Sequence, residues 1–259
     1  MHSSEEPGIA PAALAVVDDY GEIGEGASNA RYVLAENGEE YIIKGPSLVP
    51  EHPTVGANEW IAAQLAVALG LPVLDHRLVT MGGKLFFASA WMQKPTFSPA
   101  LDAELFRRCQ NRDRAYGVVV FDSWLINQDR HGNNLLVRHS RNGEHFLMLN
   151  DHSHLLVSPL GPTKADDLST CLTDPPGRFV RLPFIRDGIT DPSQLRAALD
   201  QIEGLSDAEV QSAVNSTPQE LLSTAEQAFY ADFLLQRRDC LREVLHNGSA
   251  AFPNLKGAI

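Results

Sequence analysis

The polar run from Asn127 to Asn134 and the Asp151 that follows it constrain this chain more than any other feature. Asp129 and Asn134 fall on one tight loop, so both side chains can face one ligand. Asp129 is suited to accept the proton of an attacking hydroxyl, and Asn134 can ligate a metal held on nucleotide phosphates. Asp151 lies beyond a short apolar hairpin and can hold the same metal or a second one. This order suits phosphoryl transfer, whereas the alternative is a polar loop whose Asp and Asn serve turn chemistry.

Composition places the chain among cytoplasmic globular proteins. Its 259 residues, 44% of them hydrophobic, suffice for one large domain or two lobes with a real core. No long apolar run predicts a membrane span, and the acidic N-terminus lacks the regions of a signal peptide. Cys109, Cys171 and Cys240 are too few and too widely spaced for a zinc cluster or a disulfide framework, and they indicate a reducing compartment. A formal charge of -12 disfavours direct nucleic-acid binding and anionic membranes as partners.

The first part of the chain, to about residue 94, reads as mostly strands with one helix. Two hairpins and one helix with a glycine just past its end account for most of it. The hairpin strands are expected at 31–34 and 41–44 and at 76–80 and 84–91, and the helix at 58–69. Residues 94–99, rich in proline, form a plausible connector between lobes.

The second part is mainly helical, so the chain as a whole is expected to be α+β. Residues 115–127 are apolar almost all round, which suits a buried helix leading straight to Asp129. Residues 158–191 read as a long loop with short elements. Capping boxes are expected at Ser206 and at Thr217, the second opening a long helix that extends to Val244.

Two segments of the first part are candidates for binding phosphates. The stretch from Gly21 to Arg31 is rich in glycine, which lets backbone N–H groups approach a phosphate, although it is not a P-loop. Lys44 ends a strand, and Glu59 near the start of the next helix could pair with it. Taken alone, these residues suit a surface lysine and a glutamate favoured by the helix dipole. In order with Asp129, Asn134 and Asp151, they favour a nucleotide site.

Histidines near the two aspartates raise a second hypothesis, a zinc hydrolase. His131, His152 and His154 are the candidate ligands, and the two in an extended His-x-His segment would project to one side. No His-Glu-x-x-His motif or cysteine pair accompanies them. His131 is better interpreted as a residue that shapes the loop.

The motif Asn127-x-Asp129-Arg130-His131-x-x-Asn134, followed by Asp151, resembles the HipA-like kinases. It is also similar to the Asp-Arg-His-x-x-Asn loop of the phosphoinositide kinases. Both groups share the wider protein-kinase-like fold, and the resemblance covers roughly residues 20–157. It implies a small β-rich lobe at 1–94, with the glycine loop and one helix, and a larger helical lobe at 95–259.

The resemblance further implies phosphorylation with ATP and Mg²⁺ as cofactors. By the resemblance, Asp129 matches the catalytic aspartate, Asn134 and Asp151 the magnesium ligands, and Lys44 the nucleotide lysine, with Glu59 a looser match. The glycine loop would contribute Gly24, Gly26 and Ser28, and the adenine-binding hinge Trp91 and Met92. Ser28 could itself be phosphorylated, although a turn serine is the better interpretation.

The acceptor divides the remaining hypotheses. A Ser or Thr of a protein fits the HipA-like side, and a lipid headgroup fits the phosphoinositide side. The acidic chain without a polybasic stretch makes a membrane the poorer partner. A nucleotide-binding pseudokinase acting as an interaction module has no need of a base at Asp129. The chain departs from the kinase pattern at His152-Ser153, where Phe-Gly is usual. It looks short for HipA-type toxins, which leaves the toxin role open. A regulatory partner protein stays an open alternative.

Overall fold

The computed structural model describes the chain in several stretches, which together include most of its residues. They are residues 12–23, 29–91, 97–98, 101–127, 129–155, 157–158, 161–162, 172–173 and 182–257. No helix within these stretches is long and apolar enough to cross a membrane.

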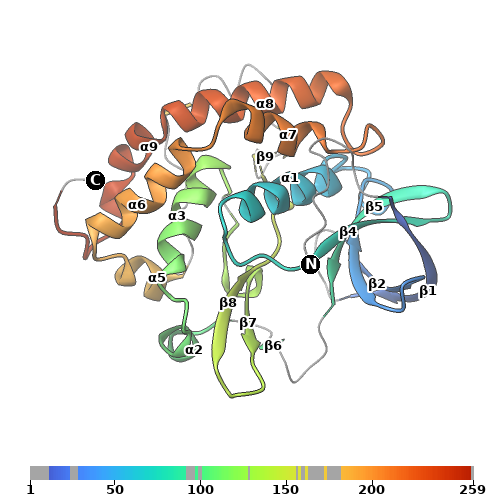
Figure 1. The fold of residues 1–259 in the computed structure, drawn as a ribbon, viewed down its shortest axis with the longest axis horizontal. Coiled ribbons are helices and arrows are strands. Elements are labelled where there is room, and N and C mark those ends of the chain that lie inside the picture. The colour runs from blue at the N-terminus through green and yellow to red at the C-terminus, as the bar shows by residue number, and fades with distance from the viewer. Residues whose placement is uncertain are drawn as a thin grey trace.

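Five strands of the N-terminal region close into a barrel in the order β1-β2-β3-β5-β4, at the right of Figure 1. They are β1 (Leu14–Glu22), β2 (Arg31–Ala35), β3 (Glu40–Lys44), β4 (His76–Met81) and β5 (Lys84–Ala90). Neighbouring strands are antiparallel except for β1 and β4, whose short parallel pairing closes the barrel. Alternate residues such as Val33, Ile43 and Phe86 fill its interior. Both expected hairpins are therefore confirmed, whereas strand β1 was not predicted.

Helix α1 (Val55–Ala68) packs between the barrel and the helical region and is buried almost all round. It begins at Val55 rather than at Asn58, as the sequence had suggested. A Cβ at Gly56 would lie 3.2 Å from the carbonyl oxygen of Lys44, so glycine lets the helix approach β3 closely. On its other side, Trp60 Nε1 donates a hydrogen bond to Ser216 Oγ at 2.9 Å. The helix is thus fixed to both halves of the molecule.

The C-terminal region is helical around a small sheet, which confirms the α+β class (Figure 1). Its helices are α2 (Ala103–Arg108), α3 (Arg114–Trp124), α5 (Pro183–Gly188), α6 (Pro192–Glu203), α7 (Asp207–Asn215), α8 (Thr224–Asp239) and α9 (Leu241–Asn247), with short 3-10 turns at Gly132–Asn134 and Ser249–Ala251. Strands β6 (Phe97–Ser98), β7 (Leu135–His139) and β8 (His145–Leu149) form a three-stranded sheet, and β9 (Val157–Ser158) pairs with β10 (Gly161–Pro162). The buried helix α3 lies within this region and ends just before the polar run at Asn127.

The expected capping boxes are half right. Ser206 and Glu209 form one at the start of α7, as predicted. The second box is formed by Ser223 and Glu226 and not by Thr217. The chain turns after Pro218, whose carbonyl oxygen accepts hydrogen bonds from the N–H groups of the two leucines at 221 and 222. The long helix consequently starts later than expected and is interrupted at Cys240, where α9 begins.

His76 in β4 makes stability depend on pH. Its ring stacks near Phe87 and meets Trp60 edge-on, with centroids 6.1 and 5.5 Å away. Burial lowers the pKa of His76 below its ordinary value, so the folded chain holds this ring neutral. The unfolded chain binds the proton more readily, and this contribution to stability is lost as the pH falls below about 6.5.

We therefore expect His76→Phe to reduce the loss of unfolding free energy between about pH 7.5 and 5.5. Urea denaturation at several pH values measures this slope. His246→Gln, at an exposed position, is the control and should keep the slope of the parent. An unchanged slope in His76→Phe would contradict the assignment.

Candidate active site

A buried ion pair organises the polar run that follows α3. Arg130 Nε and Nη2 donate to the two carboxylate oxygens of Asp122, each at 2.9 Å, and both side chains are almost fully buried. Arg130 Nη1 donates to the backbone oxygens of Asn134 and Asn150, each at 2.6 Å. Asn127 Nδ2 also donates to Asp122, at 2.9 Å. One arginine therefore connects α3, the start of β7 and the residue that precedes Asp151.

The end of α3 is fixed from a second direction by α8. Arg237, fully buried, donates to the carbonyl oxygen of Ser123 at 2.8 Å and to that of Trp124 at 3.0 Å. Carbonyl groups at a helix C-terminus lack partners within the helix, so a cation is favoured there. Ile126 then turns the chain with φ of 54°, a conformation that side chains branched at Cβ rarely adopt. The sequence had predicted a helix that leads straight to Asp129. In the structure the chain instead turns at Ile126 before it reaches Asp129.

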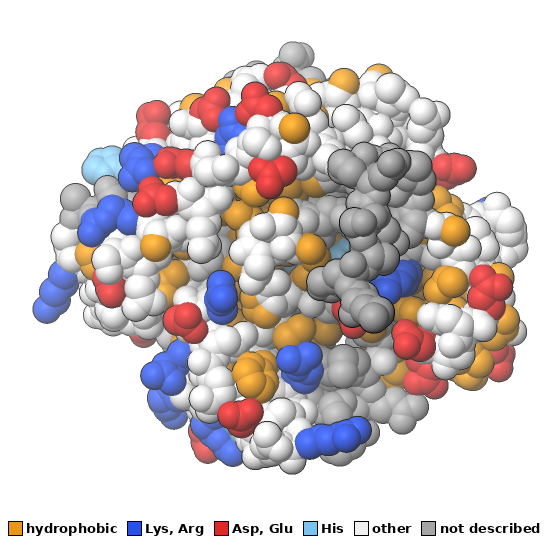
Figure 2. All heavy atoms as spheres, in the orientation of Figure 1, with side chains coloured by type: hydrophobic (Ala, Val, Ile, Leu, Met, Phe, Trp, Pro, Cys, Tyr) orange, Lys and Arg blue, Asp and Glu red, His pale blue; other side chains and the backbone are white. Residues whose placement is uncertain are grey.

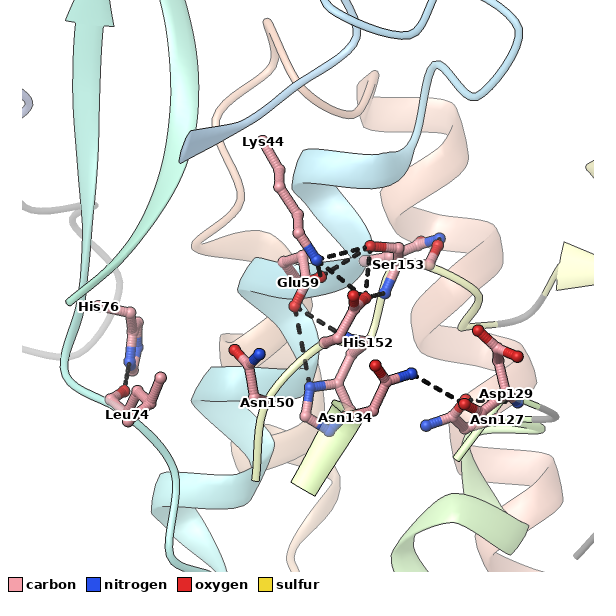
Figure 3. A network of polar contacts seen from close by, with 12 residues as sticks. Lys44, Glu59, Leu74, His76, Asn127, Asp129, Asn134, Asn150, His152 and Ser153 are labelled. Carbon is pink, nitrogen blue, oxygen red and sulfur yellow. Dashed lines mark hydrogen bonds and ion pairs between the residues drawn. The ribbon is translucent and has the colours of Figure 1, made fainter. Parts of the chain in front are cut away.

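Asp129 has its backbone held on both sides and its carboxylate partly exposed. Its N–H donates to Asn127 Oδ1 at 3.1 Å, and its carbonyl oxygen accepts from Asn134 Nδ2 at 2.8 Å. The second bond turns the carboxamide oxygen of Asn134 away from the loop backbone (Figure 3). The carboxylate is 29% exposed, with His131 Nε2 3.6 Å and His154 Nε2 3.9 Å from its Oδ2. The geometry places a carboxylate, flanked by two imidazoles, where an incoming group can reach it.

Lys44 brings Glu59 and Asp151 together. Figure 3 shows Lys44 and Glu59 beside Ser153 in this network. The Lys44 ammonium lies 2.6 Å from Glu59 Oε1 and 2.9 Å from Asp151 Oδ1. Ser153 Oγ lies within hydrogen-bond distance of all three side chains, at 3.0 Å from Lys44 Nζ, 2.8 Å from Glu59 Oε1 and 2.7 Å from Asp151 Oδ1. The N–H of His152 donates to the other oxygen of Glu59 at 2.9 Å. The network joins β3, α1 and the segment after β8.

The backbone at Asp151 is itself unusual. Its φ of 58° lies in the left-handed region, which costs most residues about 1–3 kcal/mol but is less unfavourable for Asp. Ser153 N–H donates to Asp151 Oδ1 at 3.2 Å. Asn58 Nδ2 donates to the carbonyl oxygen of Ser153 at 2.9 Å, and Asn58 Oδ1 accepts from Tyr230 at 3.2 Å. Contacts from α1 and α8 thus support the turn that presents the Asp151 carboxylate.

Opposite charges and burial set the protonation of this network. Burial alone would lower the pKa of Lys44, but Asp151 and Glu59 outweigh it and raise the pKa above its ordinary value. Burial acts to raise the pKa of Asp151, but Lys44 and the Ser153 hydrogen bonds hold it well below its usual range. Burial raises the pKa of Glu59. Two carboxylates share one ammonium, so full ionisation leaves a net negative charge.

This donor set suits Mg²⁺ better than zinc. Asp151 and Asn134 offer carboxylate and carboxamide oxygens, which hard divalent cations prefer, and Mg²⁺ commonly uses few protein ligands plus phosphate oxygens. The histidines do not converge on a single point. His152 is buried against Phe121, with ring centroids 5.9 Å apart, whereas His131 and His154 lie against Asp129. Among the residues that the structure describes, no cluster of three or more His, Cys, Asp or Glu side chains could hold a metal.

An aromatic row leads from the end of β5 across the barrel. Trp91 is 39% exposed, and its ring centroid lies 5.5 Å from that of Tyr32, which lies 4.7 Å from that of Tyr20. Tyr32 pairs with Ile42 across the strands, and Ile42 shares its side of β3 with Lys44 because side chains alternate. The row therefore borders the barrel face that carries Lys44. The other expected nucleotide contacts, Gly24, Gly26, Ser28 and Met92, lie outside the described residues.

Sequence reasoning assigned no role to Asp122 or to Ser153. The sequence did contain a signal for Asp122, since it is the one charged residue in the apolar stretch 115–127. A charge buried in such a helix requires a partner of opposite charge. Ser153 had appeared only as a departure from Phe-Gly, and its contacts connect residues distant in sequence. His154, named among zinc candidates, instead faces Asp129.

Comparison with known families agrees with this geometry. The model of the HipA-like kinases matches residues 20–157, which is more than half of the chain. The chain belongs to the HipA-like kinase family. No match among curated proteins is significant.

Solved structures show that this HipA-like kinase has a kinase-like fold. The proinflammatory kinase CtkA of Helicobacter pylori is 18% identical, with a TM-score of 0.64 over 93% of this chain and 99% of its own. HipA of Shewanella oneidensis MR-1, solved with HipB and operator DNA, is 14% identical, with a TM-score of 0.52 over 91% of this chain and 68% of its own. At such identities the likeness concerns the fold alone.

The Asp122–Arg130 pair leads to a prediction about stability. Asp122→Asn keeps the shape of the side chain but leaves Arg130 buried without its counter-charge, and breaking such a pair typically costs about 3–5 kcal/mol. Urea denaturation should therefore show a clear drop in unfolding free energy. Asp113→Asn, at an exposed position beside the same helix, is the matched control and should change it by less than about 0.5 kcal/mol. Equal effects of the two substitutions would refute the role given to the pair.

Proposed function

We propose that the protein is an ATP- and Mg²⁺-dependent kinase that transfers the γ-phosphoryl group to a Ser or Thr hydroxyl of a protein. The observation that carries this proposal is that Arg130 and Lys44 bring the candidate site residues together. Arg130 holds the segments that carry Asp129, Asn134 and Asp151, and Lys44 pairs with Asp151 from the barrel. Membership of the HipA-like kinases supports phosphoryl transfer as the reaction.

The proposed roles follow from charge and position. Lys44, held by Glu59, neutralises charge on the nucleotide phosphates. Asn134 and Asp151 would hold Mg²⁺, which would supply positive charge against the negative charge of the phosphates. Asp129 orients the acceptor hydroxyl and accepts its proton as the oxygen attacks. Trp91 and Tyr32 offer aromatic faces beside Lys44 on which the adenine can stack.

A protein acceptor is favoured over a lipid by charge. The chain carries a formal charge of -12, and an anionic membrane surface would repel it outside any local basic patch. A binding module without catalysis would not need the partly exposed carboxylate of Asp129. Incubation with radiolabelled ATP and Mg²⁺ separates the three functions, because the label would appear on protein, on lipid or on neither.

Nucleotide binding should be visible in the fluorescence of one tryptophan. Trp60 and Trp124 are buried, at 1% and 0% exposure, so a change on adding Mg²⁺ and ATP reports on Trp91. We expect quenching, together with a higher melting temperature because the ligand binds the folded state. Trp91→Phe should lose the fluorescence change, and Asp151→Asn or removal of Mg²⁺ with EDTA should weaken both signals. Unchanged fluorescence and melting at millimolar ATP would refute the nucleotide site.

Catalysis and binding should separate at Asp129. Asp129→Ala removes a group that acts on the acceptor hydroxyl, so turnover should fall by about 100- to 10,000-fold while ATP affinity stays close to that of the parent. Lys44→Ala should weaken nucleotide binding more than Asp129→Ala does, and Asp151→Ala should lose both binding and turnover. Initial rates and a fluorescence titration measure the two effects. Full phosphoryl transfer by Asp129→Ala would show that another group is the base and would reopen the histidine hypothesis.

A further inference from the structure

A cavity of about 330 Å³ lies between α2, the start of α3, α5 and the start of α6. None of the residues proposed to bind nucleotide or metal lines it. Its apolar lining comes from Phe106, Ala115, Ile185 and Ile189, and its polar lining from Arg112, Asp113 and Gln194. Such a cavity is large enough for one or two amino-acid side chains, and its chemistry favours an apolar one.

The wall of this cavity is well supported. Tyr116 lines it, and its hydroxyl accepts hydrogen bonds from the N–H groups of Thr190 and Asp191 at 3.1 and 3.0 Å. The same hydroxyl donates to the carbonyl oxygen of Gly188 at 3.3 Å. Because these bonds tie α3 to the link between α5 and α6, the cavity is preformed, and a ligand would not have to order its wall.

Exposed arginines lie on α2 and at the start of α3, beside this cavity, and on the neighbouring β7–β8 hairpin. Figure 2 shows Lys and Arg side chains, with some Asp and Glu among them, at the lower left of the face, where α2 lies in Figure 1. We call six of them the arginine surface: Arg107, Arg108, Arg112, Arg114, Arg138 and Arg141. The hairpin is fixed beside α2, because Gln110 N–H donates to the His145 carbonyl oxygen at 2.8 Å. In the described part of the chain, none of the six takes part in an ion pair, although Arg138 lies over the ring of Phe146.

This local charge contrasts with that of the whole chain. The segments that carry the six arginines, residues 101–114 and 138–145, contain four acidic residues: Asp102, Glu104, Asp113 and Glu144. These segments therefore carry a net positive charge in a protein whose formal charge is -12. On the other side of the cavity, Asp187 lies near the end of α5 and Asp191 just before α6. Unpaired arginines can each bind a carboxylate in a bidentate manner, which gives recognition beyond net charge.

We propose that the cavity and the arginine surface together dock an acidic segment of the protein substrate, with one large apolar side chain of that segment in the cavity. The inference rests on the proposed function, since it concerns the substrate of the same kinase. A nucleic acid fits less well, because a cavity lined mainly by apolar side chains offers nothing to phosphates. Docking away from Asp129 raises the local concentration of the acceptor and leaves the chemical step unchanged.

Binding can be tested without catalysis, in the Asp129→Ala variant of the full chain. The probe is a fluorescein-labelled peptide of about twelve alternating Glu and Leu residues, followed by fluorescence anisotropy. We expect saturable binding that weakens between about 50 and 250 mM salt, and loss of binding when Gln replaces each Glu. Equal binding of the Gln peptide, or no binding of the Glu peptide, would overturn the proposal.

Two variants locate the binding. Arg108→Glu combined with Arg112→Glu should weaken binding by at least about tenfold, since several charge pairs are lost. Arg77→Glu combined with Lys84→Glu makes the same change of charge on exposed barrel positions and is the matched control. Gly188→Leu should also weaken binding, because a Cβ there would lie 3.7 Å from Phe106 Cε1 and a larger side chain would fill the cavity. Equal loss in the control, or full binding by Gly188→Leu, would refute the location.

Competition with other ligands tests the class of partner. Single-stranded DNA or vesicles containing phosphatidylserine should not displace the peptide. If either displaced it and bound more tightly, the surface would belong to that ligand and the proposal would be wrong.

Kinetics connect docking to transfer. Appending the Glu and Leu segment to a serine-containing acceptor peptide should lower KM by about tenfold and leave kcat unchanged, and Arg108→Glu with Arg112→Glu should abolish that gain. Failure of the kinase proposal would appear as no transfer by the parent while anisotropy still reports binding. Failure of the docking proposal would appear as phosphoryl transfer with the same KM for the acceptor peptide with and without the appended segment.

Discussion

The buried guanidinium of Arg130 is the contact on which the geometry of this site depends. It satisfies a carboxylate on α3 and two backbone carbonyl groups that belong to segments on either side of the β7–β8 hairpin. Guanidinium groups suit this task, because their donors are rigid and point in several directions at once. Burying two charges gives little net stability, but it specifies one arrangement of the chain, since every other arrangement leaves a charge without its partner. Asp129, Asn134 and Asp151 therefore occupy fixed positions although they lie on irregular backbone.

A second set of contacts links this arrangement to the barrel. Lys44 on β3 reaches two carboxylates that come from α1 and from the segment after β8, and Ser153 fills the space between them. In this form the ammonium already neutralises part of the carboxylate charge that a metal cation would otherwise offset. Binding of a nucleotide would thus exchange partners within a set of charges that is already assembled. The left-handed backbone at Asp151 is maintained by the same contacts.

The sequence predicted elements well where local signals and burial agree. Turn residues and alternating patterns identified both hairpins, and a serine with a glutamate three positions later identified the start of α7. The same pattern at Thr217 was wrong, because Pro218 and two buried leucines form a turn there and a second serine box follows. Strand β1 was missed, since much of its surface is exposed and its pattern is weak. The boundary between lobes near residue 94 stays a prediction.

The candidate site shows the same division. Motif order identified Lys44, Glu59 and Asp151 before any geometry was known, and the structure brings these three side chains together. The assignments of Asp129 as base and of Asn134 as metal ligand stay predictions, as do those of Gly24, Gly26, Ser28 and Met92 in the nucleotide site. Asp122 and Ser153 could not be assigned from local sequence, because their roles depend on contacts with segments far away in the chain. The histidines suggested a zinc site because they are close in sequence. In the structure His152 packs against Phe121, whereas His131 and His154 lie beside Asp129.

Closure of the barrel by β1 and β4 bears on how this chain folds. Leu14 pairs with Val79, and the helix that carries Glu59 lies between these positions along the chain. Joining residues so far apart requires the intervening segment to be ordered first, because contacts of long sequence separation are costly in chain entropy. The hairpins and α1 would consequently form before β1 is added. The strand that bears Lys44 would then be in place before the barrel closes. Once closed, the barrel exposes less unpaired strand edge to another chain, which reduces a common route to aggregation during synthesis.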